Sequence, residues 1–430
     1  MSDLPIIIGF GPAGMFAALE LIELGYRPLI FERGKRIEDR HEDVKKFFTQ
    51  RQLDTESNIQ FGEGGAGSYS DGKLFSRINN SPVAQKVLET FVKFGAPEDI
   101  TYKSKPHLGT DVLCGIVRNI REYISSNGGE IRFSSKMTGL LVSGGAAKGV
   151  IINSTDEFLS SRIFLAIGHS ARDTFGMLHD KQVLIGQKPI SVGVRIEHPA
   201  ELINEFRDSK VPATYSLSYA DRETGRAVAT FCMCPGGEIV NASSENGHLE
   251  LNGMSYSKRD SQYSNSAIIV NCRTSDYGSD HPLAGIDFQK NIEQKAFLAG
   301  GSGWTAPAQN LEDFMSGSMS ASLIKNSFGM GVKPAQLSSL FPDFVAGSLK
   351  KAFLSWKDDY PVFVSDKAIL LGAETRAACP VSFPRNEKRE SANIRGLFPI
   401  GEGSGHAGGI ISSAIDAVKT VRSMDGHGGP

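Results

Sequence analysis

The chain has 430 residues, of which 40% are hydrophobic, and this is enough for two or three packed lobes with buried cores. Acidic and basic residues nearly balance, with a formal net charge of -2 and no basic run, so we expect no nucleic-acid-binding face. Five cysteines in a chain of this length do not make a disulfide framework, which favours a reducing, cytoplasmic location.

The first predicted element is a buried parallel strand over the apolar residues 4–8. No basic segment or long apolar stretch precedes it, so we expect neither a signal peptide nor a membrane span. A glycine-rich turn follows, then a helix over residues 13–24, then a second strand over residues 28–31. This order is typical of a dinucleotide-binding βαβ unit.

The turn reads Gly9-x-Gly11-x-x-Gly14, and each glycine has a physical role. Gly9 permits a tight turn, Gly11 leaves room for a pyrophosphate, and Gly14 lets the helix pack closely on the strand. The start of the helix offers free N–H groups and a positive dipole end to the phosphates. Glu32, at the tip of the second strand, can accept hydrogen bonds from a ribose, although the motif alone does not separate NAD from FAD. Their expected neighbours in the site are Pro12, Ala13 and Arg33.

A second glycine-rich segment occupies residues 61–74. Its four glycines between positions 62 and 67 disfavour a regular helix, so the backbone either turns sharply or passes close to a ligand. Aromatic and charged residues punctuate the segment, which favours a loop that contacts a cofactor over a flexible surface loop. The expected cofactor contacts here are Gly65, Ser70, Asp71, Gly72 and Lys73.

The next part of the chain predicts further elements of the first domain. Helices are expected over residues 33–51, 83–94 and 112–126, and short strands over 130–133, 138–143 and 149–153. The apolar segment 158–166 leads to Gly168, where a parallel strand of a flavin domain returns to the nucleotide. An ordinary buried strand is the alternative for this segment.

From about residue 183 the pattern changes to strand-like alternation separated by turn residues. Strands are expected over residues 191–196, 214–219, 227–233 and 267–272, and helices over 288–299, 336–340 and 345–356. We interpret this region as an antiparallel sheet with helices, inserted into the first domain.

The last informative segment predicts a strand over residues 397–400 and a helix over 409–422. Gly401 and Glu402 lie between the strand and the helix. In two-domain flavoproteins an acid at this place usually bonds the ribityl chain, and the helix that follows points its positive end at the flavin pyrimidine edge. This third segment favours FAD over NAD. The expected contacts in this half of the site are Gly168, Gly401, Glu402, Gly409 and Ile410.

The sequence therefore predicts an α/β fold with a Rossmann-like FAD-binding domain and an inserted, largely antiparallel substrate domain. The FAD-binding domain would comprise residues 1–184 and 371–430, and the inserted domain residues 185–370.

Several motifs together resemble an uncharacterised family of bacterial FAD-dependent dehydrogenases, within the broad group of glutathione-reductase-type and hydroxybenzoate-hydroxylase-type flavoproteins. The motifs that carry this resemblance are residues 64–74, 168–173, 192–199, 231–237, 252–256 and 401–403. The resemblance spans nearly the whole chain and implies FAD binding and oxidoreductase activity. It supplies no substrate.

The chain departs from the family pattern in three places. Many members carry an additional N-terminal domain, which we expect this chain to lack. Ala377-Ala378-Cys379 stands where relatives tend to have Thr-Ser-Ser, and His406 stands where a tyrosine is common. Both changes fall in segments expected near the flavin, which suggests altered substrate chemistry.

The candidate catalytic residues are three polar side chains in turns flanked by glycine or proline, and one histidine that precedes the last helix. They are His406, Arg376, Arg195 and Tyr256. A histidine near the positive end of a helix is favoured in its neutral form and can act as a base or donor, and arginines can bind a substrate carboxylate. Structural ion pairs or a packing role are the alternatives.

Cys232-Met-Cys234 lies in a predicted strand, where alternation would put both thiols on one face. Zinc needs more ligands than these two, so we expect no metal site. A buried position beside the ligand and a direct redox role both remain open.

The function predicted from the sequence is hydride transfer between FAD and a small organic substrate. The alternatives are a flavin-dependent monooxygenase that uses NAD(P)H and oxygen, and a flavin-binding protein without turnover. NAD(P)H is thus a possible external reductant, and the expected partner is a small molecule rather than a nucleic acid or a membrane. The oligomeric state is left open.

Overall fold

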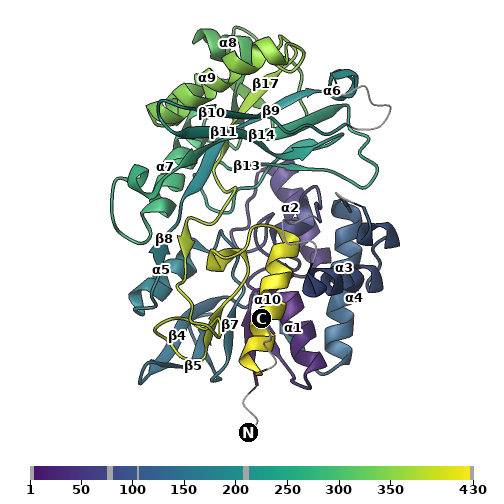
Figure 1. The fold of residues 1–430 in the computed structure, drawn as a ribbon, viewed down its shortest axis with the longest axis vertical. Helices are drawn as coiled ribbons and strands as arrows, with labels where there is room; N and C mark the ends of the chain where they lie inside the picture. The colour runs from purple at the N-terminus through teal and green to yellow at the C-terminus, as the bar shows by residue number, and fades with distance from the viewer. Residues whose placement is uncertain (1–3, 75–80, 104–105, 207–212, 427–430) are drawn as a thin grey trace.

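The computed structural model describes residues 4–74, 81–103, 106–206 and 213–426. The chain forms two lobes, stacked along the long axis in Figure 1. The beginning and end of the chain build the lower lobe, and the middle builds the upper lobe. Among the described residues, no helix has the length and apolar character needed to cross a bilayer.

A five-stranded parallel sheet forms the centre of the lower lobe. In sheet order its strands are β19 (Leu397–Pro399), β7 (Ile163–Leu165), β1 (Ile6–Ile8), β2 (Leu29–Phe31) and β3 (Glu130–Arg132). Residue Ile8 lies opposite both Phe31 and Leu165, so these strands end level with one another. All five are short and apolar, as expected for strands that helices cover on both faces.

Helices of the lower lobe surround this sheet (Figure 1). They are α1 (Pro12–Glu23), α2 (Ile37–Gln50), α3 (Pro82–Lys93), α4 (Thr110–Ser126), α5 (Arg172–Asp180) and α10 (Ile410–Met424). Small residues such as Ala17 and Ala18 let α1 pack closely on α10, so the first and last helices of the chain are neighbours. A three-stranded antiparallel sheet completes the lobe, with β4 (Met137–Ser143), β5 (Ala146–Ile152) and β6 (Asp156–Leu159).

A seven-stranded sheet forms the upper lobe, and all its neighbouring strands are antiparallel except β15 and β16. In sheet order the strands are β10 (Ser218–Asp221), β11 (Arg226–Cys234), β14 (Tyr263–Cys272), β9 (Ile190–Pro199), β17 (Ile369–Glu374), β15 (Ala306–Asn310) and β16 (Val332–Pro334). Its helices are α6 (Ala200–Phe206), α7 (Ala284–Ala299), α8 (Leu311–Ser316) and α9 (Asp343–Asp359). Two short pairs accompany it: β12 (Glu238–Asn241) with β13 (Leu251–Met254), and β8 (Gly186–Gln187) with β18 (Val381–Ser382).

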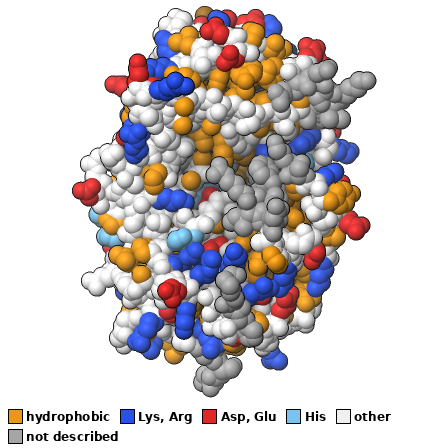
Figure 2. Space-filling view, viewed as in Figure 1, with side chains coloured by type: hydrophobic (Ala, Val, Ile, Leu, Met, Phe, Trp, Pro, Cys, Tyr) orange, Lys and Arg blue, Asp and Glu red, His pale blue; other side chains and the backbone are white. Residues whose placement is uncertain are grey.

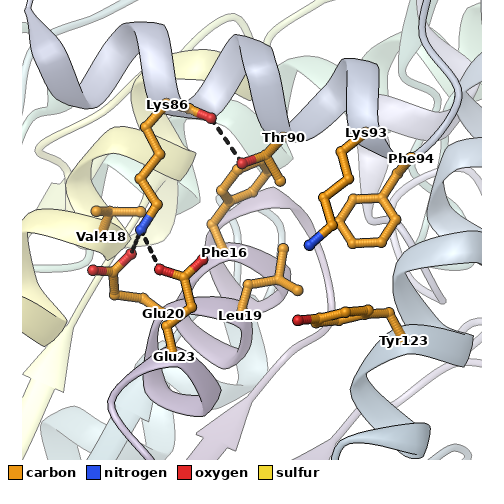
Figure 3. Close-up of a pocket in the computed structure, with 10 residues that line it drawn as sticks. All are labelled: Phe16, Leu19, Glu20, Glu23, Lys86, Thr90, Lys93, Phe94, Tyr123 and Val418. Atoms are coloured by element: carbon orange, nitrogen blue, oxygen red, sulfur yellow. Dashed lines mark hydrogen bonds and ion pairs between the residues drawn. The ribbon is translucent and has the colours of Figure 1, made fainter.

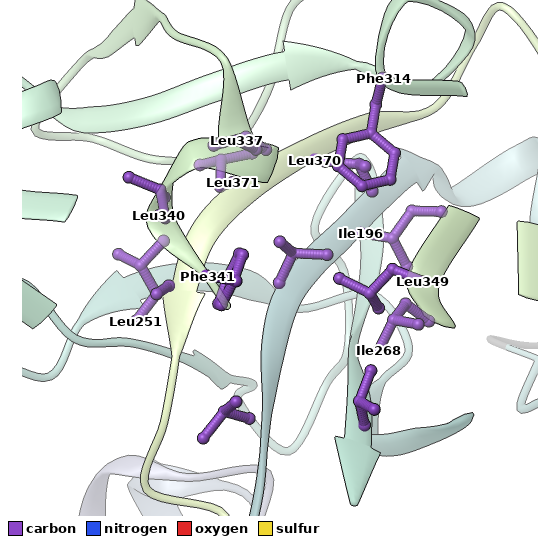
Figure 4. Close-up of a cluster of buried hydrophobic side chains, with 14 of the residues drawn as sticks. Ile196, Leu251, Ile268, Phe314, Leu337, Leu340, Phe341, Leu349, Leu370 and Leu371 are labelled. Atoms are coloured by element: carbon purple, nitrogen blue, oxygen red, sulfur yellow. The ribbon is translucent and has the colours of Figure 1, made fainter. Parts of the chain in front are cut away.

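The core of the upper lobe lies between this sheet and the helices that cover it. Figure 4 shows Ile196 and Ile268 from neighbouring strands close to Leu349 of α9, with Leu370 of β17 near Ile196 and Leu371 of the same strand further away. All five side chains are fully buried. Burying a side chain of this size contributes about 1.5–3 kcal/mol relative to leaving it exposed, so the lobe has a core of its own.

The architecture confirms the predicted α/β fold class with an inserted, largely antiparallel sheet. Three local features differ from the expectations. The strand expected over 214–219 pairs only from Ser218 onward, because the chain before it is held by bonds such as that from the amide of Leu217 to Thr230 Oγ1. Residues 337–340 form a 3₁₀ turn, and the suggested domain boundary at 370 falls inside β17.

A buried cluster of charges joins the two lobes. Arg172 of α5 pairs with Glu293 of α7 at 2.6 Å, and Arg376, which follows β17, pairs with the same carboxylate at 2.8 Å. Glu293 has no exposed surface, and the two guanidinium groups lower its pKa and keep it ionised. One carboxylate therefore holds segments of both lobes together.

Replacing this carboxylate by an amide, in Glu293→Gln, removes the anion that pairs with buried Arg376 and one of the two anions that pair with buried Arg172, whose other partner is Glu245. We expect the free energy of unfolding to fall by about 3–5 kcal/mol, measured by urea denaturation. The matched control is Asp366→Asn, which breaks an exposed pair with Lys367 and should cost less than about 0.5 kcal/mol. Equal losses in the two variants would contradict the assigned role of Glu293.

Candidate functional site

The carboxyl edge of the parallel sheet brings together the segments that the glycine motifs predicted. The residues that follow β1, β2 and β7 are Gly9, Glu32 and Ala166, and the strand register places them side by side. Gly9 has a φ of +99°, and any side chain there would collide with the carbonyl of Ala166. A side chain at Gly14 would collide with the carbonyl of Gly9, so the turn admits only glycine at both positions.

Glu32 is buried and accepts three backbone hydrogen bonds. Its Oε2 accepts from the amide of Phe10 at 2.7 Å, and its Oε1 accepts from the amides of Gly34 and Gly62, both at 2.9 Å. A carboxylate offers about four lone-pair positions, so one acceptor position on Oε2 is left. The carboxylate can therefore fix the backbone around it and still accept a bond from a ribose hydroxyl.

Arg40 of α2 fixes the same glycine loop from the other side, and the sequence analysis missed it. Its guanidinium donates to the carbonyls of Asn58, Ile59 and Glu63 at 2.6–2.8 Å and to that of Gly65 at 3.0 Å. The side chain is fully buried. A signal was present in the sequence, since Arg40 shares the apolar face of α2 with residues at helical spacing (Ile37, Val44 and Phe47).

The loop that Arg40 holds lies against the N-terminal ends of two helices. A side chain at Gly65 would come within 3.1 Å of the Cα of Gly11 and 3.7 Å of Pro12, at the start of α1. A side chain at Gly67 would come within 3.1 Å of Ile410, the first residue of α10. The positive ends of two helix dipoles therefore meet at this loop, which favours an anionic or electron-accepting ligand.

The third predicted segment, Gly401 and Glu402, is attached to α10. Asp416 of α10 accepts from the amide of Gly401 at 2.9 Å, and Glu402 accepts from the amide of Gly409 at 3.4 Å. Burial raises the pKa of Glu402 to about 7, so its carboxyl can both donate and accept near neutral pH. Asp416 was not predicted, because it is one charged residue on an otherwise ordinary helix.

Open space lies in front of several of these glycines. A side chain added at Gly168, Gly408 or Gly409 would meet no atom within 4 Å.

A cavity of about 500 Å³ opens at Arg33, the residue after Glu32, and Phe61 and Ser170 also line it. Its size is typical of a small-molecule site. The glycine turn, the free acceptor of Glu32 and this space fit a dinucleotide cofactor such as FAD.

The polar end of the glycine loop contacts the upper lobe. Asp71 is buried and accepts from both Ser255 Oγ and Arg259, and Lys73 pairs with it at 3.0 Å. The ammonium of Lys73 also donates to the carbonyl of Met233 in β11. Two of the predicted cofactor residues, Asp71 and Lys73, thus bind residues of the upper lobe. A third, Ser70, donates to the carbonyl of Gly67 within the loop.

Within the described part of the chain, the four candidate catalytic residues form no hydrogen bond or ion pair with one another. Arg195 is fully buried and pairs with Glu374 at 2.6 Å, and Arg376 belongs to the charge cluster around Glu293. His406 lies at the surface, where its Nε2 donates to the carbonyl of Phe383 at 2.8 Å. Tyr256 is 48% exposed. Both arginines are therefore occupied by carboxylates, while the histidine and the tyrosine are accessible.

A second, smaller cavity of about 50 Å³ lies on the outside of the lower lobe between α1, α3 and α4. Figure 3 shows the ammonium of Lys86 pointing at the carboxylates of Glu20 and Glu23 in this cavity. Lys86 is thus paired with two carboxylates, Lys93 lies over the ring of Tyr123, and the glycine turn does not line this cavity. The larger cavity at Arg33 is the better candidate for a ligand site.

On the face drawn in Figure 2, basic side chains gather in the lower half with acidic side chains among them.

Comparison with known proteins assigns a family. Residues 189–377 match the family described as "FAD-dependent protein, C-terminal domain-like". The chain is also 43% identical over 429 residues to an uncharacterised protein of Clostridium beijerinckii, which covers 98% of this chain and 80% of that protein. The chain belongs to this family. The matched region runs from β9 to just beyond β17, so it comprises the sheet of the upper lobe.

Several solved structures are distantly similar to this chain over nearly its whole length. A triple mutant of the flavin-dependent brominase Bmp2 is 13% identical, with 99% of this chain and 79% of that chain covered and a TM-score of 0.42. CtdE in complex with FAD is 11% identical, and the match covers 99% of this chain and 84% of CtdE with a TM-score of 0.38. An L-amino acid deaminase from Proteus vulgaris is 11% identical, and the match covers 99% of this chain and 92% of the deaminase with a TM-score of 0.39.

Replacing Arg40 by methionine keeps the stem of the side chain and removes the guanidinium. Four carbonyls of the glycine loop lose their donor, so we expect a loss of about 3–5 kcal/mol in the free energy of unfolding. Urea denaturation of the flavin-free protein measures this loss, and the ratio of flavin absorbance to protein should also fall. Lys46→Met on the exposed face of the same helix is the control and should change neither quantity.

Glu63 gives the loop a pH dependence. Its buried carboxyl accepts from the amide of Ile37 and from Arg121, but burial outweighs these bonds and raises its pKa to about 7. The unfolded chain has a Glu pKa of about 4.3, so the folded protein holds the proton more tightly. The contribution of Glu63 to stability is therefore greatest below about pH 4 and declines as the pH rises through about 7.

Glu63→Gln keeps an acceptor for both donors and cannot ionise. Between about pH 5 and pH 8, we expect the wild-type free energy of unfolding to fall by up to about 3 kcal/mol relative to that of Glu63→Gln. Urea denaturation across this range measures the difference. The exposed Glu387→Gln should follow the wild-type profile. A Glu63→Gln profile parallel to wild type would be inconsistent with the raised pKa.

Proposed function

We propose that the chain is an FAD-dependent oxidoreductase that transfers a hydride between the flavin and a small organic substrate. The observation that carries this proposal is the glycine loop, which Glu32 and Arg40 fix between the N-terminal ends of α1 and α10. Membership in a family of FAD-dependent proteins supports it independently. FAD, when bound, supplies the two-electron chemistry, and the chain supplies binding, orientation and electrostatics.

The phosphates of the cofactor would lie at the glycine turn. Gly11 carries no side chain that could block their approach, and the N-terminal end of α1 would offer backbone N–H groups to them. Glu32 would bind the ribose through its remaining acceptor position. The cavity that begins at Arg33 would take the adenosine end, since it opens directly beside Glu32.

The other end of the cofactor would lie along Glu402 and the start of α10. With a pKa of about 7, Glu402 can donate to one ribityl hydroxyl and accept from another. The open space at Gly408 and Gly409 would leave room for the ring system beside the N-terminal end of α10. The positive dipole end there favours the negative charge that develops on reduction.

Among the candidate catalytic residues, His406 is the best placed to move a proton. Because its Nε2 donates to the Phe383 carbonyl, its Nδ1 is an acceptor, and partial burial of the ring lowers its pKa. It precedes α10 by only a few residues, next to the proposed flavin position. Arg195 and Arg376 would act through Glu374 and Glu293 as positioning residues, and Tyr256 would lie at the substrate entrance.

The first test is an anaerobic titration of the purified protein with NADH and NADPH while the flavin absorbance is followed. Loss of absorbance would identify a nicotinamide-dependent reductase, and a hydroxylated product under oxygen would instead favour the monooxygenase alternative. An unchanged spectrum would indicate that an organic substrate reduces the flavin directly. A colourless protein that takes up no added FAD would overturn the proposal.

Two helical glycines give a matched pair of variants for the cofactor site. Gly14→Ala places a methyl group against the carbonyl of Gly9, and we expect FAD affinity to fall by about tenfold or more, since about 1.4 kcal/mol of strain is enough. Gly115→Ala in α4 meets no atom within 4 Å and should leave affinity unchanged. Fluorescence titration of flavin-free protein with FAD measures both.

A further inference from the structure

Two cysteines of β11 lie at the point where the glycine loop meets the upper lobe. Cys232 is half-buried and Cys234 is fully buried, and Met233 between them accepts a hydrogen bond from Lys73 of the loop. Residues 67 and 73 of the same loop contact α10 and β11 respectively. Six residues of extended chain span at most about 20 Å, so this loop places the start of α10 and the cysteine-bearing part of β11 at the two ends of one short segment.

The strand is irregular at these cysteines. Phe231 pairs with Ala267 and Cys234 pairs with Asn265, so Cys232 and Met233 together face a single residue of β14. This is a β-bulge, and Cys232 within it has a φ of +43°. A residue other than glycine rarely adopts this conformation, and such strain is concentrated at functional sites.

Donors and cations surround the two thiols. Arg195 lies 3.7 Å from the sulfur of Cys234 and donates to the carbonyl of Cys232 at 2.8 Å. The Cys234 thiol donates to the backbone carbonyl of Cys232 at 3.3 Å. The neighbouring Cys234 thiol and the charges of Lys73 and Arg195 lower the pKa of Cys232 to about 5, whereas the neighbouring Cys232 and burial raise the pKa of Cys234. Asn265 is fully buried, and among the described residues its Nδ2 has no hydrogen-bond partner.

The arrangement separates the two thiols by role. Cys232 is accessible and is stabilised as a thiolate, which is the nucleophilic form of cysteine. Cys234 keeps its proton, is fully buried two residues further along the strand, and donates to the backbone carbonyl of Cys232. The other cysteines differ, since burial raises the pKa of both Cys272 and Cys379 to about 12.

We propose that Cys232 and Cys234 form a redox-active dithiol that reduces small-molecule disulfides, with Cys232 as the attacking thiol and Cys234 as the resolving thiol. The Cys232 sulfur forms a bond to one sulfur of the substrate, the substrate S–S bond breaks, and one thiol leaves with a proton. Cys234 then loses its proton and attacks the Cys232 sulfur, which releases the second thiol. The sum is a protein dithiol and a substrate disulfide converted to a protein disulfide and two thiols.

Two electrons and two protons restore the dithiol. An external dithiol can supply them, and so can reduced flavin in the lower lobe, a step that rests on the proposed function. In that case an anaerobic reductive titration of the oxidised holoprotein should consume twice as many electron equivalents as flavin alone. Consumption equal to that of flavin alone would exclude the coupling between flavin and thiols but not the dithiol itself.

The test of the dithiol uses the aromatic disulfide 5,5′-dithiobis(2-nitrobenzoate) on the purified full chain. In wild type we expect rapid release of two thionitrobenzoates per chain and a protein lighter by two hydrogen atoms, without a retained adduct. Cys234→Ser should release one and retain the adduct, and Cys232→Ser should lose the rapid phase. Cys272→Ser is the control and should react as wild type does.

The pH profile separates an activated thiolate from a merely exposed thiol. The rate of the rapid phase should be nearly constant between about pH 6.5 and pH 8, where an ordinary thiol of pKa about 8.5 reacts roughly tenfold faster per pH unit. Lys73→Met should move the profile toward that of an ordinary thiol. A wild-type adduct that persists on Cys232, or a rapid phase that survives in Cys232→Ser, would overturn the proposal. Flavin absorbance recorded on the same samples reports the proposed function separately.

Discussion

Two buried side chains of opposite charge hold the glycine loop, and the rest of the site depends on them. Glu32 accepts the amides on one side of the loop, and Arg40 donates to the carbonyls on the other. Among the residues that the structure describes, neither side chain has an ion-pair partner, so backbone dipoles carry the compensation that a buried charge requires. The loop must therefore keep one conformation, and Gly62 is glycine because the stem of Arg40 occupies the place of its side chain.

This constraint links the two halves of the chain. The loop fixed at Gly62 and Gly65 continues to Asp71 and Lys73, which bind residues of the upper lobe. The same loop therefore sets the distance between the parallel sheet, where a nucleotide would bind, and the strand that carries the two thiols.

Local patterns were sufficient to predict much of this fold. The glycine turn, the helices α1 and α10 and the short parallel strands follow from apolar periodicity and turn residues within a few positions. Strand β17 was missed because its neighbours β9 and β15 are far away in the sequence. The roles of Arg40 and Glu293 depend on partners brought together by folding, so a charged residue in a polar segment gave little sign of being buried. The sequence did place Glu32 and the glycine loop in one site, because their motifs are local.

The shared carboxylate of Glu293 also limits how the two lobes can be recombined. Arg172 comes from the lower lobe and has almost no exposed surface, so it needs an anion from whatever packs above it. A chimaera that joins this lower lobe to an unrelated cap, however well shaped, would bury a guanidinium against nothing of opposite charge. Exchange of caps between relatives is thus restricted to those that bring carboxylates to face Arg172, as Glu293 of α7 and Glu245 do here.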